Sequence, residues 1–210
     1  MKLFSMTWSN VIFHPDQTTF EEEFANAAPK KATSRFGIGI LIAAFISGVS
    51  TFVYETFFNA YVGSRQALAF WLMQNPAEKS AIVDFVGSPI AGGLFSFLGF
   101  LIGAPIIILI GIMLSLWLAK MLGGKGNLEK HTFSFALFIP SLIIVANAFG
   151  VIRQIGVCVA SPILWVYAII LSVIAVKSVH GLSTAKSLIA VIVPFIVSTV
   201  IAMIISPPHL

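Results

Sequence analysis

Histidine and cysteine are the residue types best suited to metal chemistry in this 210-residue chain. His131 and His180 fall in two connecting segments that we expect on the same side of the molecule. His14, in the N-terminal arm, is expected on that side as well. Two imidazoles without a carboxylate or thiolate make a poor zinc site, and only the tertiary structure decides whether His14 adds a third ligand. Cys158 is the single cysteine, so it forms no intramolecular disulfide and no zinc-knuckle spacing. We therefore predict no metal and no cofactor.

A second candidate for chemistry is the glycine-rich segment from Gly123 to Gly126, which carries Lys125. It lacks the GxxxxGK[ST] spacing of a phosphate loop and follows an apolar segment instead of a buried strand. We interpret it as a helix stop followed by a flexible turn. The acids from Glu21 to Glu23 lie in a polar arm where a solvated face is the default, and no hydrolase or HExxH pattern occurs. We predict no catalytic residue and no enzymatic activity.

The composition indicates the environment in which these residues are held. Hydrophobic residues make up 58% of the chain and charged residues 10%, against roughly 25% charged residues in a soluble domain. The chain is therefore predicted to be an integral membrane protein. Its formal charge of +4 does not point to nucleic acid, because Lys and Arg set the orientation of membrane proteins. We expect the lipid bilayer as a partner and no nucleic acid.

Charge-free runs locate the membrane spans, since a helix needs roughly 20 apolar residues to cross the hydrocarbon layer. We predict an all-α fold: a cytoplasmic arm at residues 1–35, then a domain of five transmembrane helices at residues 36–210. The spans are expected at about residues 36–53, 94–118, 132–152, 159–176 and 188–205. The run 85–119 is too short for two full spans, and a re-entrant entry at Gly87–Gly93 is its alternative.

Basic residues predict the orientation of these spans. With five helices, nine Lys and Arg residues fall on the side of the arm and of the loops 119–131 and 177–186, and three fall on the other side. The nine are Lys2, Lys30, Lys31, Arg35, Lys120, Lys125, Lys130, Lys177 and Lys186, and the three are Arg65, Lys79 and Arg153. By the positive-inside rule we place the N-terminus in the cytoplasm and the C-terminus outside, in the cell membrane if the source is prokaryotic.

The arm is predicted to contain an amphipathic helix. Thr18 and Thr19 each stand three residues before a glutamate, as in a capping box. Phe20 and Phe24 then lie four apart on one face. We expect this helix to lie on the bilayer or to fold over the helix bundle, and a solvated tail is the alternative. The apolar segment 54–84 is expected at the membrane interface, as an aromatic belt or as a partner surface.

The interior of the predicted spans holds no ionisable side chain, which disfavours ion-coupled transport. Asn147 is the most polar deep residue, and it is expected to bond a neighbouring helix. Gly99 and Gly103 form a GxxxG pair, extended upstream by Gly92 and Ser96, that favours close packing within the chain or between two copies. Four prolines are expected to shape packing, although kinks also open cavities in transporters: Pro105, Pro140, Pro162 and Pro194.

The segment 177–186 is predicted to be a tight turn between the last two spans. Gly181 suits a left-handed helix C-cap, and Ser183 or Thr184 suits the N-cap of the next helix. The dipole at the helix C-terminus is expected to favour the charged form of His180.

Several motifs follow one another between Lys120 and Pro194. They are the turn Leu122-Gly-Gly-Lys-Gly126, Pro140, Tyr167, Lys177-x-x-His180-Gly-Leu-Ser-Thr-x-Lys186 and Pro194, with His14-Pro-x-x-Thr-x-Phe20 in the arm. This arrangement resembles the Yip family, membrane proteins named for interaction with Ypt/Rab GTPases. The resemblance implies five spans, a cytoplasmic N-terminus and a C-terminus outside. The Asp-Leu-Tyr-Gly-Pro motif of eukaryotic members, which engage prenylated Rab proteins, does not occur, so the chain is more similar to short prokaryotic-type members.

Together these observations predict a membrane adaptor or scaffold. We expect it to dock a membrane or peripheral protein on the cytoplasmic face, and a homo-oligomer stays open as well. The residues predicted for docking are Phe20, Phe24, Lys125, Lys177, His180 and Lys186, and those for helix packing are Gly99, Gly103 and Asn147. The alternative is a channel or carrier for a neutral small solute whose path passes near Asn147, and a third hypothesis is a bilayer-shaping role.

Overall fold

The computed structural model describes residues 11–25, 29–58, 85, 88–149 and 159–205. Its main elements are all helices, which confirms the predicted all-α class for this part of the chain. The helices are α2 (Gln17–Ala25), α3 (Pro29–Phe58), α6 (Pro89–Met121), α7 (Leu128–Ala136), α8 (Ile139–Ala148), α10 (Ser161–His180) and α11 (Thr184–Ile205). Most of the segment expected at the interface, residues 59–84, lies outside the described residues.

Four helical stretches are long and apolar enough to cross a membrane. They are Phe36–Phe57, Pro89–Met121, Leu128–Ala148 and Ser161–His180, which correspond to the first four predicted spans. In the last helix the described apolar part, Thr184–Val200, is shorter than these four. The chain is therefore a multi-pass membrane protein with at least these four candidate spans.

Helix α6 decides between the two interpretations of the run 85–119. It is one continuous helix of 33 residues, and the hydroxyl oxygen of Ser88 caps its start by accepting a hydrogen bond from the Ala91 N–H at 3.2 Å. Pro89 occupies a first-turn position, where its missing N–H costs no helical bond. The stretch from Pro89 to Gly93 belongs to this helix, so these residues form no separate re-entrant segment.

The third span is broken into α7 and α8. The break lies at Leu137 and Phe138, because Pro140 has no N–H to bond the carbonyl of Ala136. Phe138 accordingly has a non-helical φ of −128° before the chain resumes as α8. Pro140 thus divides a span that charge counting predicted as continuous.

The helices extend past the charge-free runs, and this corrects one expectation. Helix α3 runs from Pro29 to Phe58 instead of 36–53, so the candidate span ending at Phe57 includes Glu55, which is 3% exposed. His131 and His180 likewise fall within candidate spans. The expectation that the spans carry no ionisable side chain is therefore wrong, because helices continue beyond the ends of the apolar runs that were counted.

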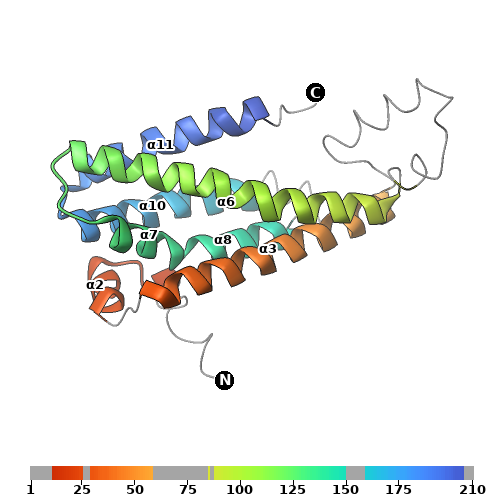
Figure 1. Cartoon of the computed structure of the whole chain (residues 1–210), viewed down its shortest axis with the longest axis horizontal. Coiled ribbons are helices and arrows are strands. Elements are labelled where there is room, and N and C mark those ends of the chain that lie inside the picture. The colour runs from red at the N-terminus through yellow and green to blue at the C-terminus, as the bar shows by residue number, and fades with distance from the viewer. Residues whose placement is uncertain (1–10, 26–28, 59–84, 86–87, 150–158, 206–210) are drawn as a thin grey trace.

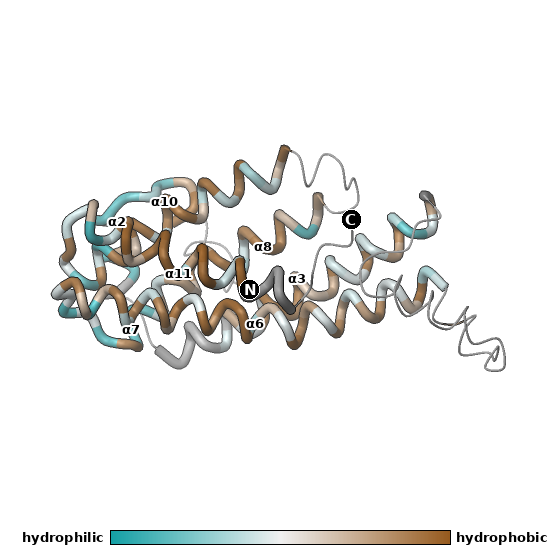
Figure 2. The backbone as a smooth tube through the Cα atoms, turned by 90° about the horizontal axis from the view of Figure 1, so that it is seen from above, coloured by the Kyte–Doolittle hydropathy of each residue, from teal (hydrophilic) through white to brown (hydrophobic). Residues whose placement is uncertain are grey.

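The helices run along one common axis (Figure 1). The long helices α3 and α6 lie side by side and antiparallel, α7 and α8 follow α3, and α11 packs on α6. At one end, the left of Figure 1, the arm helix α2, the turn from α6 to α7 and the turn from α10 to α11 come together. Hydrophilic residues gather at this same end (Figure 2). The grouping matches the prediction that these three segments share one side.

Helices α3 and α6 approach most closely at two glycines that the sequence analysis did not single out. A Cβ built on Gly48 would lie 2.9 Å from the Gly93 carbonyl oxygen, and one built on Gly93 would lie 2.9 Å from the Gly48 carbonyl oxygen. Beside them, the hydroxyl of Ser96 lies 2.9 Å from that of Ser47 and accepts a hydrogen bond from that of Thr51 at 2.9 Å. This backbone contact has the small-residue chemistry expected between helices in lipid.

The predicted GxxxG pair is not part of that contact. Nothing lies within 4 Å of a Cβ built on Gly99 or on Gly103. Of the upstream small residues, Ser96 does lie in the α3–α6 contact. The GxxxG pair therefore lies on α6 outside the closest contact with α3, and its role in helix packing, within the chain or between two copies, stays a prediction.

Candidate functional site

The arm packs onto the bundle through buried apolar side chains. Val11 and Phe20 are fully buried, and the Phe20 ring meets the Phe138 ring edge-on at 6.4 Å. The hydroxyl of Tyr167, on α10, donates a hydrogen bond to the carbonyl oxygen of Ile12. In this structure the arm helix α2 therefore packs on α7 and α10. Burial gives Phe20 a packing role, so its ring does not reach the surface in this structure.

The arm helix starts at a different cap from the one predicted. Helix α2 begins at Gln17, and the carboxylate of Asp16 accepts a hydrogen bond from the Thr19 N–H at 2.7 Å. The capping box predicted on Thr18 and Thr19 is therefore wrong. Asp16, directly before the helix, is the N-cap, and aspartate is among the preferred residues at that position. The bond from the Thr19 N–H, followed by that from its hydroxyl, lowers the pKa of Asp16 from 3.8. A negative charge here also suits the helix N-terminus.

The glycine turn (residues 123–126) ends α6 in a defined geometry. Gly123 has a φ of +93°, and its N–H bonds the Lys120 carbonyl oxygen at 3.0 Å, while the Gly124 N–H bonds that of Ala119 at 2.9 Å. These two bonds and the left-handed glycine make a Schellman motif, which confirms the predicted helix stop. The turn is also fixed to α10, since the Lys125 N–H donates to the His180 carbonyl oxygen at 3.2 Å. It is therefore a packed turn and not the flexible one expected.

Two further glycines let this turn lie directly on His180. A Cβ built on Gly124 would lie 2.7 Å from His180 Nδ1. One built on Gly126 would lie 2.5 Å from Val179 Cγ1 and 2.9 Å from His180 Cε1. Any side chain at either position would push the turn off α10, so both glycines are required by close approach, not by φ.

His131 and His180 form a buried pair beneath the glycine turn (the histidine pair). His180 Nε2 lies 3.0 Å from His131 Nδ1, and both residues are at most 2% exposed. The Gly126 N–H donates to His180 Nδ1 at 3.2 Å, and His131 Nε2 lies 3.2 Å from the Ile112 carbonyl oxygen. The two rings therefore join the turn, α10, α7 and α6 in one hydrogen-bonded chain.

The backbone groups at the two ends of this hydrogen-bonded series define which nitrogen of each ring carries a proton. A backbone N–H only donates, so His180 Nδ1 must be an unprotonated acceptor, and a carbonyl only accepts, so His131 Nε2 must carry a proton. In the neutral tautomers that follow, His180 Nε2–H donates to His131 Nδ1. This corrects the expectation of a charged His180, because burial and the N–H of Gly126 outweigh the helix dipole.

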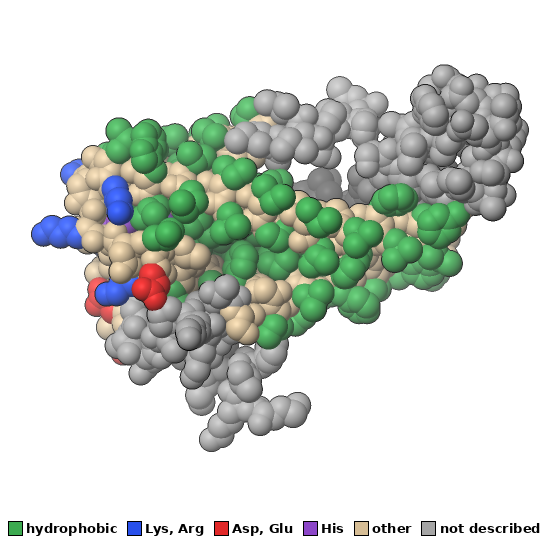
Figure 3. Space-filling view, viewed as in Figure 1, with side chains coloured by type: hydrophobic (Ala, Val, Ile, Leu, Met, Phe, Trp, Pro, Cys, Tyr) green, Lys and Arg blue, Asp and Glu red, His purple; other side chains and the backbone are tan. Residues whose placement is uncertain are grey.

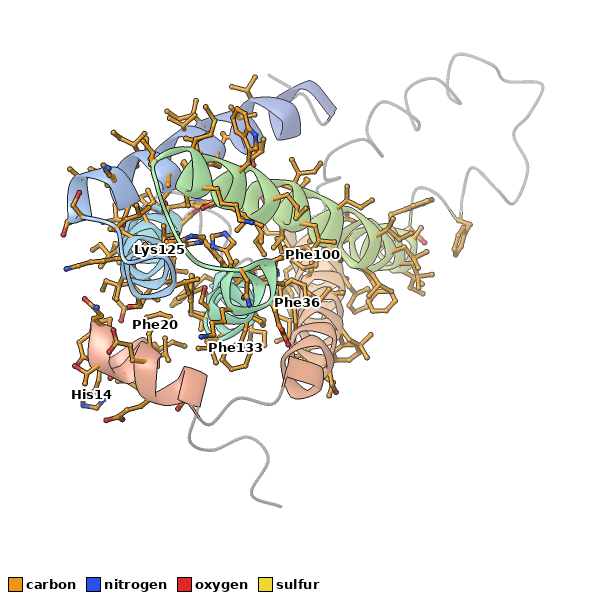
Figure 4. All side chains as sticks on the ribbon, turned by 60° about the vertical axis from the view of Figure 1, so that its left-hand side comes forward. His14, Phe20, Phe36, Phe100, Lys125 and Phe133 are labelled. Carbon is orange, nitrogen blue, oxygen red and sulfur yellow. The ribbon has the colours of Figure 1, made fainter. Side chains whose placement is uncertain are left out.

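The metal hypothesis finds no support in the described residues. They contain no group of three or more His, Cys, Asp and Glu side chains placed to hold a metal ion. His131 and His180 bond each other directly, and His14 is exposed on the outer side of the arm (Figure 4). The fold therefore does not bring His14 to the pair as a third ligand.

Lysine side chains surround this end of the bundle on the outside. Those of Lys120, Lys125, Lys130 and Lys186 are exposed, and Lys177 is half-buried. On the face that Figure 3 shows, the charged side chains gather at this end, while hydrophobic side chains cover the rest of the described surface. The Lys186 ammonium also donates to the Leu122 carbonyl oxygen at 3.0 Å, at the end of α6. We call the four exposed lysines the lysine surface.

The predicted residues thus separate into two sets. Lys125 and Lys186 lie on the lysine surface, with Lys177 beside it, and His180 and Phe20 lie beneath it. The Phe24 side chain lies outside the described ones. The backbone carbonyl of Asn147, not its side chain, accepts a hydrogen bond from the Ser50 hydroxyl at 2.9 Å, so its predicted packing role stays a prediction. The docking roles of Lys125, Lys177, Lys186, His180, Phe20 and Phe24 stay predictions.

Sequence reasoning missed three contributors to this site. His131 was considered only as a metal ligand, Tyr167 only as part of a resemblance, and the closeness of Gly126 to α10 not at all. The available signal was the grouping of polar and small residues in two short turns predicted on one side. The sequence offers no spacing rule that pairs a histidine in one turn with a histidine in another.

Comparisons with known proteins place the chain in a family. Residues 9–205, nearly the whole chain, match the model of the Yip1 domain. No curated protein and no solved structure matches the chain. The chain therefore belongs to the Yip1 domain family.

Proposed function

We propose that this protein is a non-enzymatic membrane adaptor that docks a protein partner on the lysine surface. The observation that carries the proposal is the set of contacts that join the segments under these lysines. The arm, the glycine turn and α10 are joined there by the Phe20–Phe138 contact, the Tyr167–Ile12 bond and the histidine pair. A preorganised surface loses little conformational freedom when a partner binds.

The charge of this surface indicates the kind of partner. The two turns carry five lysines, at positions 120, 125, 130, 177 and 186, and one acid, Glu129. Such a field attracts an acidic segment of a membrane-associated or peripheral protein and raises its rate of association. The lysines also support a cytoplasmic location for this end, with the N-terminus inside.

The complete topology belongs to the same proposal. Helix α11, Thr184–Ile205, would be the fifth span and would carry the C-terminus outside. A cysteine replacing Lys125 in a Cys158→Ser background tests the sidedness. We expect a membrane-impermeant maleimide to label it only from the cytoplasmic side of the native membrane.

Charge reversal tests the docking role. The tagged protein is purified from its native membrane in mild detergent, and co-eluting proteins are identified with their stoichiometry. We expect a near-equimolar partner, and at least about a tenfold loss of it in the Lys125→Glu, Lys130→Glu variant, because two opposite charges now face the acidic segment. Thr18→Glu controls for an added negative charge alone, since it places a glutamate on the exposed arm without removing a lysine.

Substitution is a sharper test than removal of the arm. Deleting residues 1–28 would take Val11 and Phe20 out of the core and expose the ring of Phe138. A loss of binding would then follow from either docking or misfolding. Equal capture by the wild type and the double glutamate variant would contradict the adaptor proposal.

A path for a neutral solute is the second candidate, and Asn147 favours it. The side-chain nitrogen of Asn147 is buried and has no hydrogen-bond partner among the described residues. A spare donor at the C-terminal end of α8 suits a polar solute. Flux into proteoliposomes that Asn147→Leu abolishes would support this function, and flux no higher than in protein-free vesicles would reject it.

A further inference from the structure

The histidine pair lies where four structural elements meet. His131 belongs to α7 and His180 to the last turn of α10. Their hydrogen bonds reach Ile112 in the C-terminal third of α6 and Gly126 in the glycine turn. Among the described residues, the two imidazoles thus join all four of these elements through one series of hydrogen bonds, and any change in their protonation acts on each element.

Neither ring has a nitrogen that can accept an added proton without losing a hydrogen bond. A proton on His180 Nδ1 would point at the N–H of Gly126, 3.2 Å from that nitrogen. A proton on His131 Nδ1 would point at the N–H of His180 Nε2, 3.0 Å away. Either event replaces a hydrogen bond by two opposed donors and places a positive charge in a buried site, and both changes are unfavourable.

The surrounding charges do not compensate for such a proton. Around the pair, α6 contributes Lys120, the glycine turn Lys125, α7 Glu129 and Lys130, α10 Lys177, and α11 Lys186, so five of these six groups are cations. Glu129 is exposed in the first turn of α7, at the helix N-terminus. The arm helix α2 packs on α7 and α10 and carries Glu21 to Glu23, of which the side chains of Glu21 and Glu22 are exposed. Helix α3 also packs on α7 and adds the basic residues Lys30, Lys31 and Arg35 near its start. A charged histidine gains stability only by leaving the buried position and reaching water.

We propose that protonation of the histidine pair releases the glycine turn from α10, so that acid conditions disassemble the lysine surface. The movement follows from contact: Gly124 and Gly126 lie directly on the His180 ring, and Lys125 is carried between them. A ring that swings toward water takes away the acceptor of the Gly126 N–H. The inference rests on the proposed function insofar as the turn carries a docking residue, and it names the regulation of that site.

Linkage gives the size and the sign of the effect. The closed form holds two neutral rings, while the open form binds protons with the ordinary affinity of histidine, so opening is favoured as the pH falls. Each histidine that is protonated only in the open form raises the opening constant by about tenfold per pH unit below about pH 6.5. Two histidines therefore raise it by between about tenfold and about a hundredfold per unit.

Amide hydrogen exchange on the full chain in lipid nanodiscs measures this opening directly. The probes are the N–H groups of Lys125 and Gly126, corrected for intrinsic exchange, between about pH 7.5 and about pH 5. We expect their opening constants to rise at least tenfold across this range in the wild type. The His131→Gln, His180→Gln variant should lose that dependence, since amides keep hydrogen-bonding capacity but do not titrate. His14→Gln, which removes an exposed histidine, should retain it.

NMR of the histidine ring nitrogens in the wild type measures tautomer and protonation state directly. It therefore tests the inference even if the double variant does not fold. At neutral pH we expect one neutral tautomer per ring, protonated at Nε2 in both, and joint protonation as the turn opens. Exchange that does not depend on pH, or a dependence that persists unchanged in the double glutamine variant, would overturn the inference.

Capture of the partner at the same pH values separates the two proposals. Loss of capture on acidification, together with opening of the turn, supports both. A turn that opens while no partner binds at any pH rejects the adaptor role alone. Capture that depends on Lys125 while the turn stays closed at about pH 5 rejects the acid-sensitive release alone.

Discussion

The lysine end of the bundle and the crossing of α3 with α6 are held together by different chemistry. At the lysine end, buried polar groups carry the contacts: a histidine pair, a tyrosine hydroxyl and backbone N–H groups of a turn. At the crossing, two backbones touch at Gly48 and Gly93, and short hydroxyl side chains bond beside them. The first set can exchange its partners with water and protons, whereas the second is surrounded by apolar side chains and depends on shape. Protonation and solvent exchange can therefore change the contacts at the lysine end, but not the backbone contact between α3 and α6.

The largest expected effect comes from filling the glycine contact at the crossing. Gly93→Leu places a side chain where even a Cβ would lie 2.9 Å from the Gly48 carbonyl oxygen. We expect it to lower the free energy of unfolding in detergent by about 2–3 kcal/mol, as overpacking does in other tightly packed sites. Chemical denaturation followed by circular dichroism measures the change.

The matched control lies six positions further along the same helix. Gly99→Leu meets no atom within 4 Å of its Cβ and lies on the exposed side of α6. We expect its unfolding free energy to stay the same or to rise by up to roughly 0.8 kcal/mol, the gain in helix propensity. Equal destabilisation by both variants would show that the crossing is not packed as described.

A smaller effect is expected from the bond that holds the arm. Tyr167→Phe removes the hydroxyl that donates to the Ile12 carbonyl oxygen. We expect a loss of about 1 kcal/mol, seen as faster amide exchange in residues 11–25 while exchange in α3 and α6 stays unchanged. Slower or unchanged exchange in the arm would mean that Val11 and Phe20 alone fix it, and the polar part of the comparison would then be weaker.

The smallest expected effect is an acid-induced fraying of the arm helix. The folded arm holds the pKa of Asp16 below 3.8, so its carboxylate contributes stability that is present above pH 3.8 and lost as the pH falls through the lower folded value. Asp16→Asn keeps an oxygen that caps the Thr19 N–H, but it does not titrate. The Thr19 amide proton shift should therefore change with acid in the wild type and stay constant in the variant.

This last step lies well below the histidine range, so the two acid transitions can be told apart. A transition in the Thr19 shift at the same pH as opening of the glycine turn would indicate that the arm and the turn move as one unit. Separate transitions would show that the lysine end contains two independent parts.

The sequence predicted the helices well because their signals are local. Apolar runs located four spans, and Gly181 was placed correctly as a left-handed cap, with a φ of +65°. Helix α11 starts at Thr184, so Ser183 precedes it as one of the two predicted caps. Each of these features depends on residues only a few positions apart, where propensity and periodicity hold.

The contacts between distant segments were not predictable in the same way. GxxxG spacing occurs at Gly99 and Gly103, yet α6 uses Gly93, because the face that packs is chosen by where α3 lies. Similarly, local rules place His180 at a helix end that favours charge, while burial and the N–H of Gly126, 54 positions away, favour its neutral form. One sequence carries no information on which of several small or polar residues will meet across the bundle.

Helix α6 has a consequence for the bilayer around the protein. Its 33 residues rise about 50 Å, whereas the hydrocarbon layer is about 30 Å thick. The two lengths match only if the helix tilts strongly or if the surrounding lipid thickens, and each adjustment has an elastic cost that depends on acyl-chain length. The position of this protein among membranes of different thickness is then set in part by the length of one helix, independently of any partner that it binds.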